Sequence, residues 1–120
     1  MDAQEWQDLE RYGSWERMTS GEWFLPSMPE AKEEHQRTFR LLKQLNELQN
    51  TDQERAKGIL REILPEESAV PGLHVPLNLE YGCNLVCGER VFINFGATIL
   101  AQAAVRLGNG VMVGPNCSLI

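Results

Sequence analysis

Small apolar residues recur at every sixth position through the second half of the chain. The series begins at Val75, and positions four residues later form a second apolar series. One step lengthens to eight after Ile99, and the six-residue period then resumes. The two series are Val75, Tyr81, Cys87, Ile93, Ile99, Leu107, Val113 and Leu119, and Leu79, Leu85, Val91, Ala97, Ala103, Val111 and Cys117. A helix repeats every 3.6 residues and a strand every two, so neither produces this period.

A six-residue period predicts the coils of a parallel β-helix. Each hexapeptide forms one short strand and a corner, and its apolar side chains fill the inside of the coil. Four glycines share one place in the repeat and are expected where a Cβ would clash or φ is positive. They are Gly82, Gly88, Gly108 and Gly114. The longer step around Gln102 predicts a bulge in a strand or corner, a feature that often lies beside a site.

The first half of the chain has helical periodicity instead. One amphipathic helix is predicted from about Pro29 into the high forties, and a second ends at Pro65. The first has the inner residues His35, Phe39, Leu42, Leu45 and Leu48, and the second has Ala56, Ile59, Leu60, Ile63 and Leu64. A shorter helix is predicted after Ser14, ending near Gly21.

Two capping boxes are predicted at the starts of the long helices. Ser27 and Glu30 have the required spacing before the first helix, and Thr51 and Glu54 have it before the second. Together the patterns predict an α+β protein, with a helical cap over residues 1–70 and the first coils of a parallel β-helix over residues 71–120. Because the coils reach Ile120 without a polar terminal segment, we expect a longer polypeptide or a cover over the exposed edge.

Composition narrows the possible partners and compartment. The 120 residues are 42% hydrophobic and carry a net charge of −6, which argues against nucleic acid or an anionic membrane surface as a partner. Neither a membrane-spanning stretch nor a secretory signal is predicted. Three cysteines suggest reduced thiols and a cytoplasmic location. The Cys83–Cys87 spacing alone is weak support for zinc, so no metal site is predicted.

The order of these segments resembles one family. A short helix, a Gly-Glu-aromatic segment, a helical hairpin and hexapeptide coils are similar to the maltose and galactoside O-acetyltransferases, which include the nodulation sugar acetyltransferases. The segments that carry the resemblance are Met18-x-x-Gly21-Glu22-Trp23-Phe24, Tyr81-Gly82-Cys83-Asn84, Phe92-Ile93-Asn94-Phe95, Leu107-Gly108-Asn109 and Gly114-Pro115-Asn116.

The resemblance implies a fold, an assembly and a reaction. It implies a left-handed β-helix and a homotrimer with active sites between neighbouring copies. It also implies transfer of an acetyl group from acetyl-CoA to the hydroxyl of a small sugar. In such a reaction a histidine takes the hydroxyl proton, and hydrogen-bond donors stabilise the oxyanion.

By resemblance, three residues are expected to contact the sugar acceptor. They are Asn94, Glu80 and Gln102, the last where the family has an acidic residue. The family's catalytic histidine falls beyond Ile120, so no catalytic residue is assigned and the chain alone is expected to be inactive. Most of the CoA-binding region also falls beyond it, and no cofactor-binding residue is assigned.

Other roles stay open at this point. Neither His35 nor His74 has an acidic neighbour at a spacing typical of an oriented base, and His35 is expected to be a packed helix residue. Asn94 suits a corner of the coil as well as a role in ligand binding. For Glu80 the alternative is an exposed corner position without a ligand. The chain could be a non-catalytic trimeric assembly module, or an acyltransferase for an amine or serine acceptor.

Overall fold

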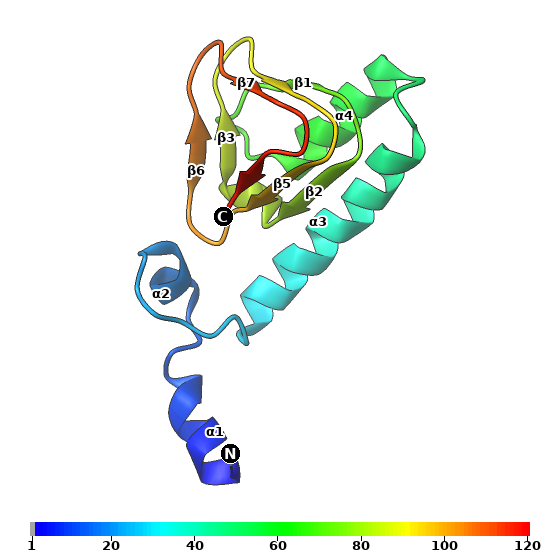
Figure 1. The fold of residues 1–120 in the computed structure, drawn as a ribbon. Coiled ribbons are helices and arrows are strands. Elements are labelled where there is room, and N and C mark those ends of the chain that lie inside the picture. Colours follow the sequence, from blue (N-terminus) through cyan, green and yellow to red (C-terminus); the bar gives the residue numbers. More distant parts are fainter. Residues whose placement is uncertain (1) are drawn as a thin grey trace.

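The structure, a computed structural model, describes residues 2–120 apart from the side chain of Trp6. Within that range the chain forms four α-helices, then eight short strands with one turn of 3₁₀ helix among them. The molecule is elongated, with extents of 51 × 27 × 26 Å. The strands lie at one end, and α1 lies at the other (Figure 1).

Two short helices begin the chain. α1 (Ala3–Glu10) was not expected from the apolar pattern, and it begins with a full capping box. The Asp2 side chain accepts from the Glu5 N–H at 2.9 Å, and the Glu5 carboxylate accepts from the Asp2 N–H at 2.8 Å. α2 (Trp15–Thr19) begins as predicted, because the Ser14 hydroxyl accepts from the backbone N–H of Arg17 at 3.1 Å.

The two long helices have the predicted extents but different caps. α3 (Pro29–Glu47) begins after Met28, which makes no side-chain cap, so the predicted Ser27 box is wrong. Pro29 has no N–H to satisfy in the first turn, which makes a cap less necessary. α4 (Gln53–Ile63) is capped by Asp52, whose carboxylate accepts from the Arg55 N–H at 3.0 Å. The predicted Thr51 box is therefore also wrong: an anionic acceptor one residue later takes its place.

The buried face of α3 is rotated from the predicted stripe. Ala31, Thr38, Leu42 and Leu45 are buried, whereas Phe39 is 46% exposed. A polar residue at the centre of a buried face could not be recognised from hydrophobicity. Thr38 is tolerated because its hydroxyl accepts the buried Gly82 N–H at 3.0 Å.

The strands form three small parallel sheets, and successive strands along the chain belong to the three sheets in turn. The first contains β1 (Gly72–Leu73), β4 (Phe92–Ile93) and β7 (Met112–Val113), and the second contains β2 (Leu77–Glu80), β5 (Ala97–Leu100) and β8 (Ser118–Leu119). The third contains β3 (Leu85–Cys87) and β6 (Val105–Leu107). Consecutive strands belong to different sheets, so the chain winds in stacked coils.

Each coil is longer than three hexapeptides. Paired residues such as Leu77 and Ala97 are 20 positions apart, against about 18 for an unbroken hexapeptide repeat. The added residues lie in the corners after β2 and β5, at 81–84 and 101–104. The second of these is the predicted break after Ile99, and it is confirmed. The first was missed, because Tyr81 keeps the six-residue step by coincidence.

Tyr81 and Ala103 are therefore not inner residues of the coils. Tyr81 has φ 56°, and its ring packs outside the coil against Met18, Met28 and Ala31. In the equivalent corner Ala101 is fully buried and Ala103 is only half-buried. The remaining inner residues join the hairpin of α3 and α4 in one apolar core.

The glycine expectation holds in the first coil. A Cβ on Gly82 would lie 2.5 Å from the Ile63 side chain, so α4 packs directly on this corner. A Cβ on Gly88 would likewise meet Asn109, in the next coil. Gly108 and Gly114 have open space around them and no positive φ, so the expectation is wrong for those two.

Candidate functional site

Two of the three predicted acceptor contacts meet at one corner of the coils. Glu80 is the last residue of β2, and Gln102 lies in the extended corner after β5, one coil further along. The Gln102 amide donates to Oε2 of Glu80 at 3.2 Å. The equivalent corner segments stack directly on each other, so residues 22 positions apart in sequence become neighbours.

Asn84 fixes the corner that carries Gln102. Its amide nitrogen donates to the carbonyl oxygens of Ala101 at 2.9 Å and Gln102 at 3.1 Å. Because these bonds satisfy backbone acceptors in the added segment, the corner has a defined path despite its extra residues.

His35 of α3 faces the same carboxylate. Its Nε2 lies 3.4 Å from Oε1 of Glu80, and it is buried without a partner in hydrogen-bonding geometry. The imidazole lies against the ring of Phe39 at a centroid distance of 4.2 Å and is stacked on Tyr81 at 5.3 Å. Glu80 is 45 residues from His35, so no pattern in the sequence indicated this pairing, and only the fold brings the two side chains together.

The charge of Glu80 also affects its neighbour in sequence. Burial raises the pKa of the Tyr81 phenol above its usual value, and the nearby Glu80 carboxylate raises it further. The tyrosine therefore stays neutral at physiological pH.

Asn94 lies at a different corner. Its Oδ1 accepts from the Phe95 N–H at 2.8 Å and lies 3.4 Å from Nδ1 of His74. This corner precedes β5, whereas Gln102 follows it, so the length of β5 separates the two. Four strand residues span about 13 Å. The structure therefore brings Glu80 and Gln102 together and leaves Asn94 apart within one chain.

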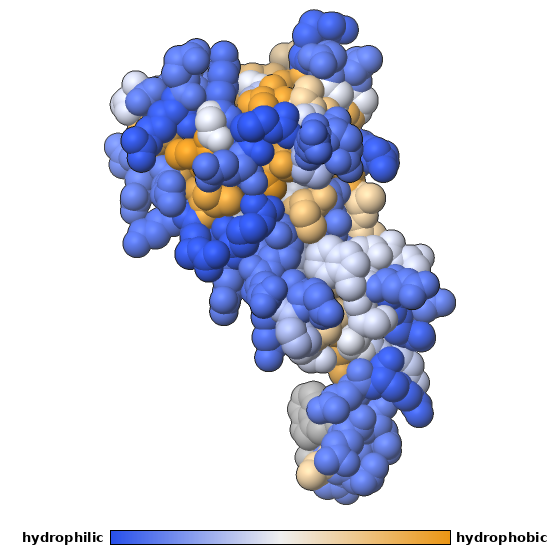
Figure 2. All heavy atoms as spheres, turned by 180° about the vertical axis from the view of Figure 1, so that it is seen from behind, coloured by the Kyte–Doolittle hydropathy of each residue, from blue (hydrophilic) through white to orange (hydrophobic). Residues whose placement is uncertain are grey.

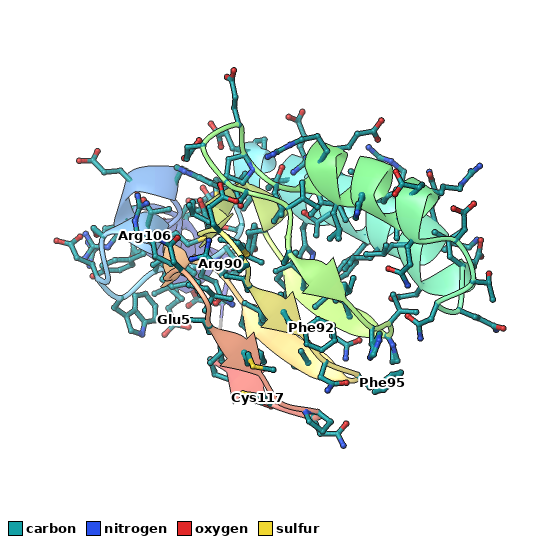
Figure 3. All side chains as sticks on the ribbon, turned by 90° about the horizontal axis from the view of Figure 1, so that it is seen from above. Glu5, Arg90, Phe92, Phe95, Arg106 and Cys117 are labelled. Carbon is teal, nitrogen blue, oxygen red and sulfur yellow. The ribbon has the colours of Figure 1, made fainter. Side chains whose placement is uncertain are left out.

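His74, beside Asn94, packs against two further aromatic rings. It lies edge-on to Phe92 at a centroid distance of 5.0 Å and tilted against Phe95 at 4.5 Å. Phe95 is 47% exposed and Met112, in the last coil, is 78% exposed. Figure 3 shows Phe92 and Phe95 in the middle of the stack, between the α3–α4 hairpin and the last coil with Cys117. These residues form an outer apolar corner.

A groove lies beside Glu80. It has a volume of about 420 Å³ and lies between α3 and the outward faces of β2 and β5. Its lining mixes apolar and polar side chains: Phe39, Leu42, Lys43, Asn46, Leu77, Asn78, Leu79, Glu80, Thr98 and Leu100. A groove with both kinds of surface suits a ligand with apolar faces and hydroxyl edges.

The described residues offer few other candidates. Among them, no group of three His, Cys, Asp or Glu side chains is arranged to hold a metal ion. No helix within residues 2–120 has the length and apolarity needed to cross a membrane. The back of the molecule has its apolar surface over the upper, coil-containing part, and the lower part is mostly hydrophilic (Figure 2).

Comparison with known proteins agrees with this architecture. Residues 17–67 match the maltose acetyltransferase hexapeptide capping motif. Nodulation protein L of Rhizobium leguminosarum bv. viciae is 34% identical over 100 residues, which cover 83% of this chain and 53% of that protein. Galactoside O-acetyltransferase of Escherichia coli is 24% identical over 104 residues, which cover 87% and 51%.

Solved structures of acetyltransferases also resemble this chain. A hexapeptide-repeat acetyltransferase of Vibrio cholerae, complexed with acetyl coenzyme A, has a TM-score of 0.70 at 26% identity over 88% of this chain and 57% of that one. A maltose O-acetyltransferase of Clostridium difficile has a TM-score of 0.80 at 23% identity, over 87% and 56%, which supports the fold.

The capping motif and the coils together define a hexapeptide-repeat protein with a helical cap of the maltose acetyltransferase type. The chain is similar to the maltose and galactoside O-acetyltransferases in its capping motif, its sequence and its fold. It spans about half the length of the curated relatives that it matches.

Proposed function

We propose that this chain is part of an acetyl-CoA-dependent O-acetyltransferase that acts on a sugar hydroxyl. The observation that carries the proposal is the pairing of Glu80 with Gln102, beside a groove of mixed polarity. Similarity to this family supports acetyl transfer, and a similar protein was solved with acetyl coenzyme A. Three free cysteines are consistent with the reducing cytoplasm.

The architecture in this proposal is a helical cap over residues 1–70 and the first turns of a left-handed parallel β-helix over residues 71–120. Rotation of consecutive strands among three parallel sheets supports the β-helix. Similarity to solved hexapeptide-repeat acetyltransferases supports it as well.

The acceptor site is proposed to lie between copies in a homotrimer. Glu80 and Gln102 meet in one chain, whereas Asn94 lies at the other end of β5. One small sugar can contact all three only if Asn94 comes from a neighbouring copy. The exposed Phe95 and Met112 beside that corner supply apolar surface for the contact.

In the proposed reaction the sugar hydroxyl gives its proton to a general base while its oxygen attacks the thioester carbonyl. The carbon–sulfur bond then breaks, and the CoA sulfur leaves and takes up a proton. The Glu80 carboxylate accepts hydrogen bonds from acceptor hydroxyls, and the Asn94 amide holds the same sugar. His35 Nε2 faces Glu80 and His74 Nδ1 faces Asn94. Neither is assigned as the base, because the resemblance places the family's catalytic histidine at neither position.

Acetylation assays on the complete polypeptide test this function. The protein is incubated with acetyl-CoA and with maltose, galactosides, a primary amine and serine, and products are identified by mass spectrometry. We expect an acetate ester on a sugar and none on residues 1–120 expressed alone. Preferred acetylation of the amine or serine would contradict the sugar assignment. Turnover by the isolated 1–120 chain would contradict the claim that it lacks the base.

A further inference from the structure

We propose that His35, on the helical cap, is a positioning residue that orients the Glu80 carboxylate for the acceptor. This inference rests on the proposed function, because it assumes that Glu80 contacts a sugar. It assigns a role in acceptor recognition to α3, which otherwise covers the first coil.

The carboxylate of Glu80 lies between two groups from different parts of the fold. Gln102 donates to Oε2 at 3.2 Å from the second coil, and Nε2 of His35 lies 3.4 Å from Oε1 on the cap side. With its hydrogen on Nε2, the imidazole can donate to Oε1 after a small adjustment. Both carboxylate oxygens of Glu80 are then held in place. Without these two donors, a glutamate at an open corner samples several rotamers.

His35 is itself held in place. Phe39 and Tyr81 lie on its ring, and Tyr81 is fixed in turn by its own packing under α2. Nε2 is buried and has no hydrogen-bond partner, so Glu80 is the group that its position serves. A buried polar atom without a bond is costly, which argues that this arrangement has a function.

The pair leaves Glu80 able to bind. Its side chain is 29% exposed and lines the groove, so part of the carboxylate reaches solvent. A carboxylate has about four acceptor positions, and His35 and Gln102 use two. The others can accept sugar hydroxyls. Fixing the carboxylate beforehand reduces the entropy lost when the acceptor binds.

Three substitutions at one position separate positioning from packing. His35→Phe keeps the aromatic contacts and removes the donor. His35→Gln places an amide N–H near Nε2, and His35→Asn is too short to reach Oε1. Gln36→Ala is the control, because Gln36 is exposed on the same helix. Steady-state kinetics of the complete protein are measured with maltose and with acetyl-CoA, together with the thermal unfolding midpoint.

For His35→Phe we expect the KM for maltose to rise about tenfold, equivalent to about 1.4 kcal/mol, with the KM for acetyl-CoA unchanged. His35→Gln should restore the maltose KM to within about threefold of the original. An unchanged maltose KM in His35→Phe would overturn the inference while leaving the proposed function intact. Should His35→Phe not fold, equal maltose KM values for the Gln and Asn variants would overturn it. Absence of sugar acetylation by the unmodified protein would reject both.

Discussion

At the scale of single residues, Glu34 joins the cap to the first coil. Its carboxylate accepts from the Arg37 guanidinium at 2.6 and 2.8 Å and from the Cys83 N–H at 3.0 Å. Arg37 also donates to the Ile63 carbonyl at the end of α4, at 2.8 Å. One ion pair therefore connects α3, α4 and the corner after β2. Each partner satisfies backbone groups that helix ends leave open.

Burial and hydrogen bonding oppose each other at this carboxyl. Burial works to raise the pKa of Glu34, but the bonds from Arg37 and Cys83 outweigh it, and the pKa lies below its usual value. Burial and the same carboxylate raise the pKa of the Cys83 thiol to about 12, so it stays protonated.

A Glu34→Gln substitution tests this junction. A lowered pKa in the folded state means that the ionised carboxylate stabilises the protein above the ordinary pKa of 4.5 and loses that effect as the pH falls through the folded-state value. We expect a loss of about 2 kcal/mol at pH 7. The difference from the unmodified protein should narrow towards pH 3. Urea unfolding at both pH values measures it.

Glu33→Gln, at the exposed neighbouring position, is the matched control and should have little effect. A difference between Glu34→Gln and the unmodified protein that is the same at both pH values would show that ionisation of this carboxylate does not stabilise the junction.

At the scale of elements, α3 completes the open edge of the first coil. β2 pairs with β5 on one side only, and on the other side two asparagines of the hairpin take the place of a strand. Asn46 exchanges two hydrogen bonds with the backbone of Leu77, at 2.9 and 3.0 Å. Asn50 exchanges two with Val75, at 2.8 and 3.3 Å.

The two asparagines come from different parts of the hairpin. Asn46 lies in the last turn of α3, and Asn50 lies in the turn that follows the helix, with a φ of 63°. The end of the helix and its turn together therefore place two side-chain amides beside residues 75 and 77. Side-chain amides offer the same donor and acceptor as a peptide group, so the coil edge is satisfied without another strand.

Asn46→Ala is expected to lower the free energy of unfolding by about 2 kcal/mol, because both backbone groups of Leu77 lose their partner. Asn46→Asp keeps the acceptor and loses the donor, so it should also destabilise. Guanidinium unfolding followed by circular dichroism measures both. Gln44→Ala, at an exposed position on the same helix, is the control. An Asn46→Ala protein as stable as this control would contradict the edge-capping role.

At the scale of the whole molecule, the proposed site needs more than one copy. A single chain holds Glu80 beside Gln102 and places Asn94 about the length of β5 away. The proposed trimer resolves this separation by bringing the Asn94 corner of one copy to the Glu80 corner of the next. Closed rotational symmetry then builds three identical sites.

Mixing two inactive variants tests the shared site. In the complete protein Glu80→Ala and Asn94→Ala should each lose most sugar acetylation. After the two are unfolded and refolded together, about a quarter of the sites in random trimers combine intact Glu80 with intact Asn94. Recovery of about that fraction of activity is expected, measured as acetylated maltose. No recovery in demonstrably mixed oligomers would place both residues within one copy or outside the site.

The apolar pattern was enough to predict most elements but not their details. The six-residue period located the coils, and the helical pattern located α3 and α4, because both reflect repeated burial. Tyr81 shows where this reasoning fails: an apolar residue kept the period while packing outside the coil. α1 was missed because its start depends on polar capping by Asp2 and Glu5 rather than on a buried stripe.

The candidate site, too, was predictable from the sequence only in part. The resemblance indicated Glu80, Gln102 and Asn94, but not which of them meet, since that depends on stacking at a spacing of 20 residues. The sequence by itself determined the coils and the helical cap, and it carried the resemblance to the family, because periodic burial and short motifs are local properties. Only the tertiary structure decided that His35 faces Glu80, that Asn46 and Asn50 close the coil edge, and that Asn94 lies apart. The three contacts join residues that are 25 to 45 positions apart in the sequence, and no local pattern encodes contacts over such separations.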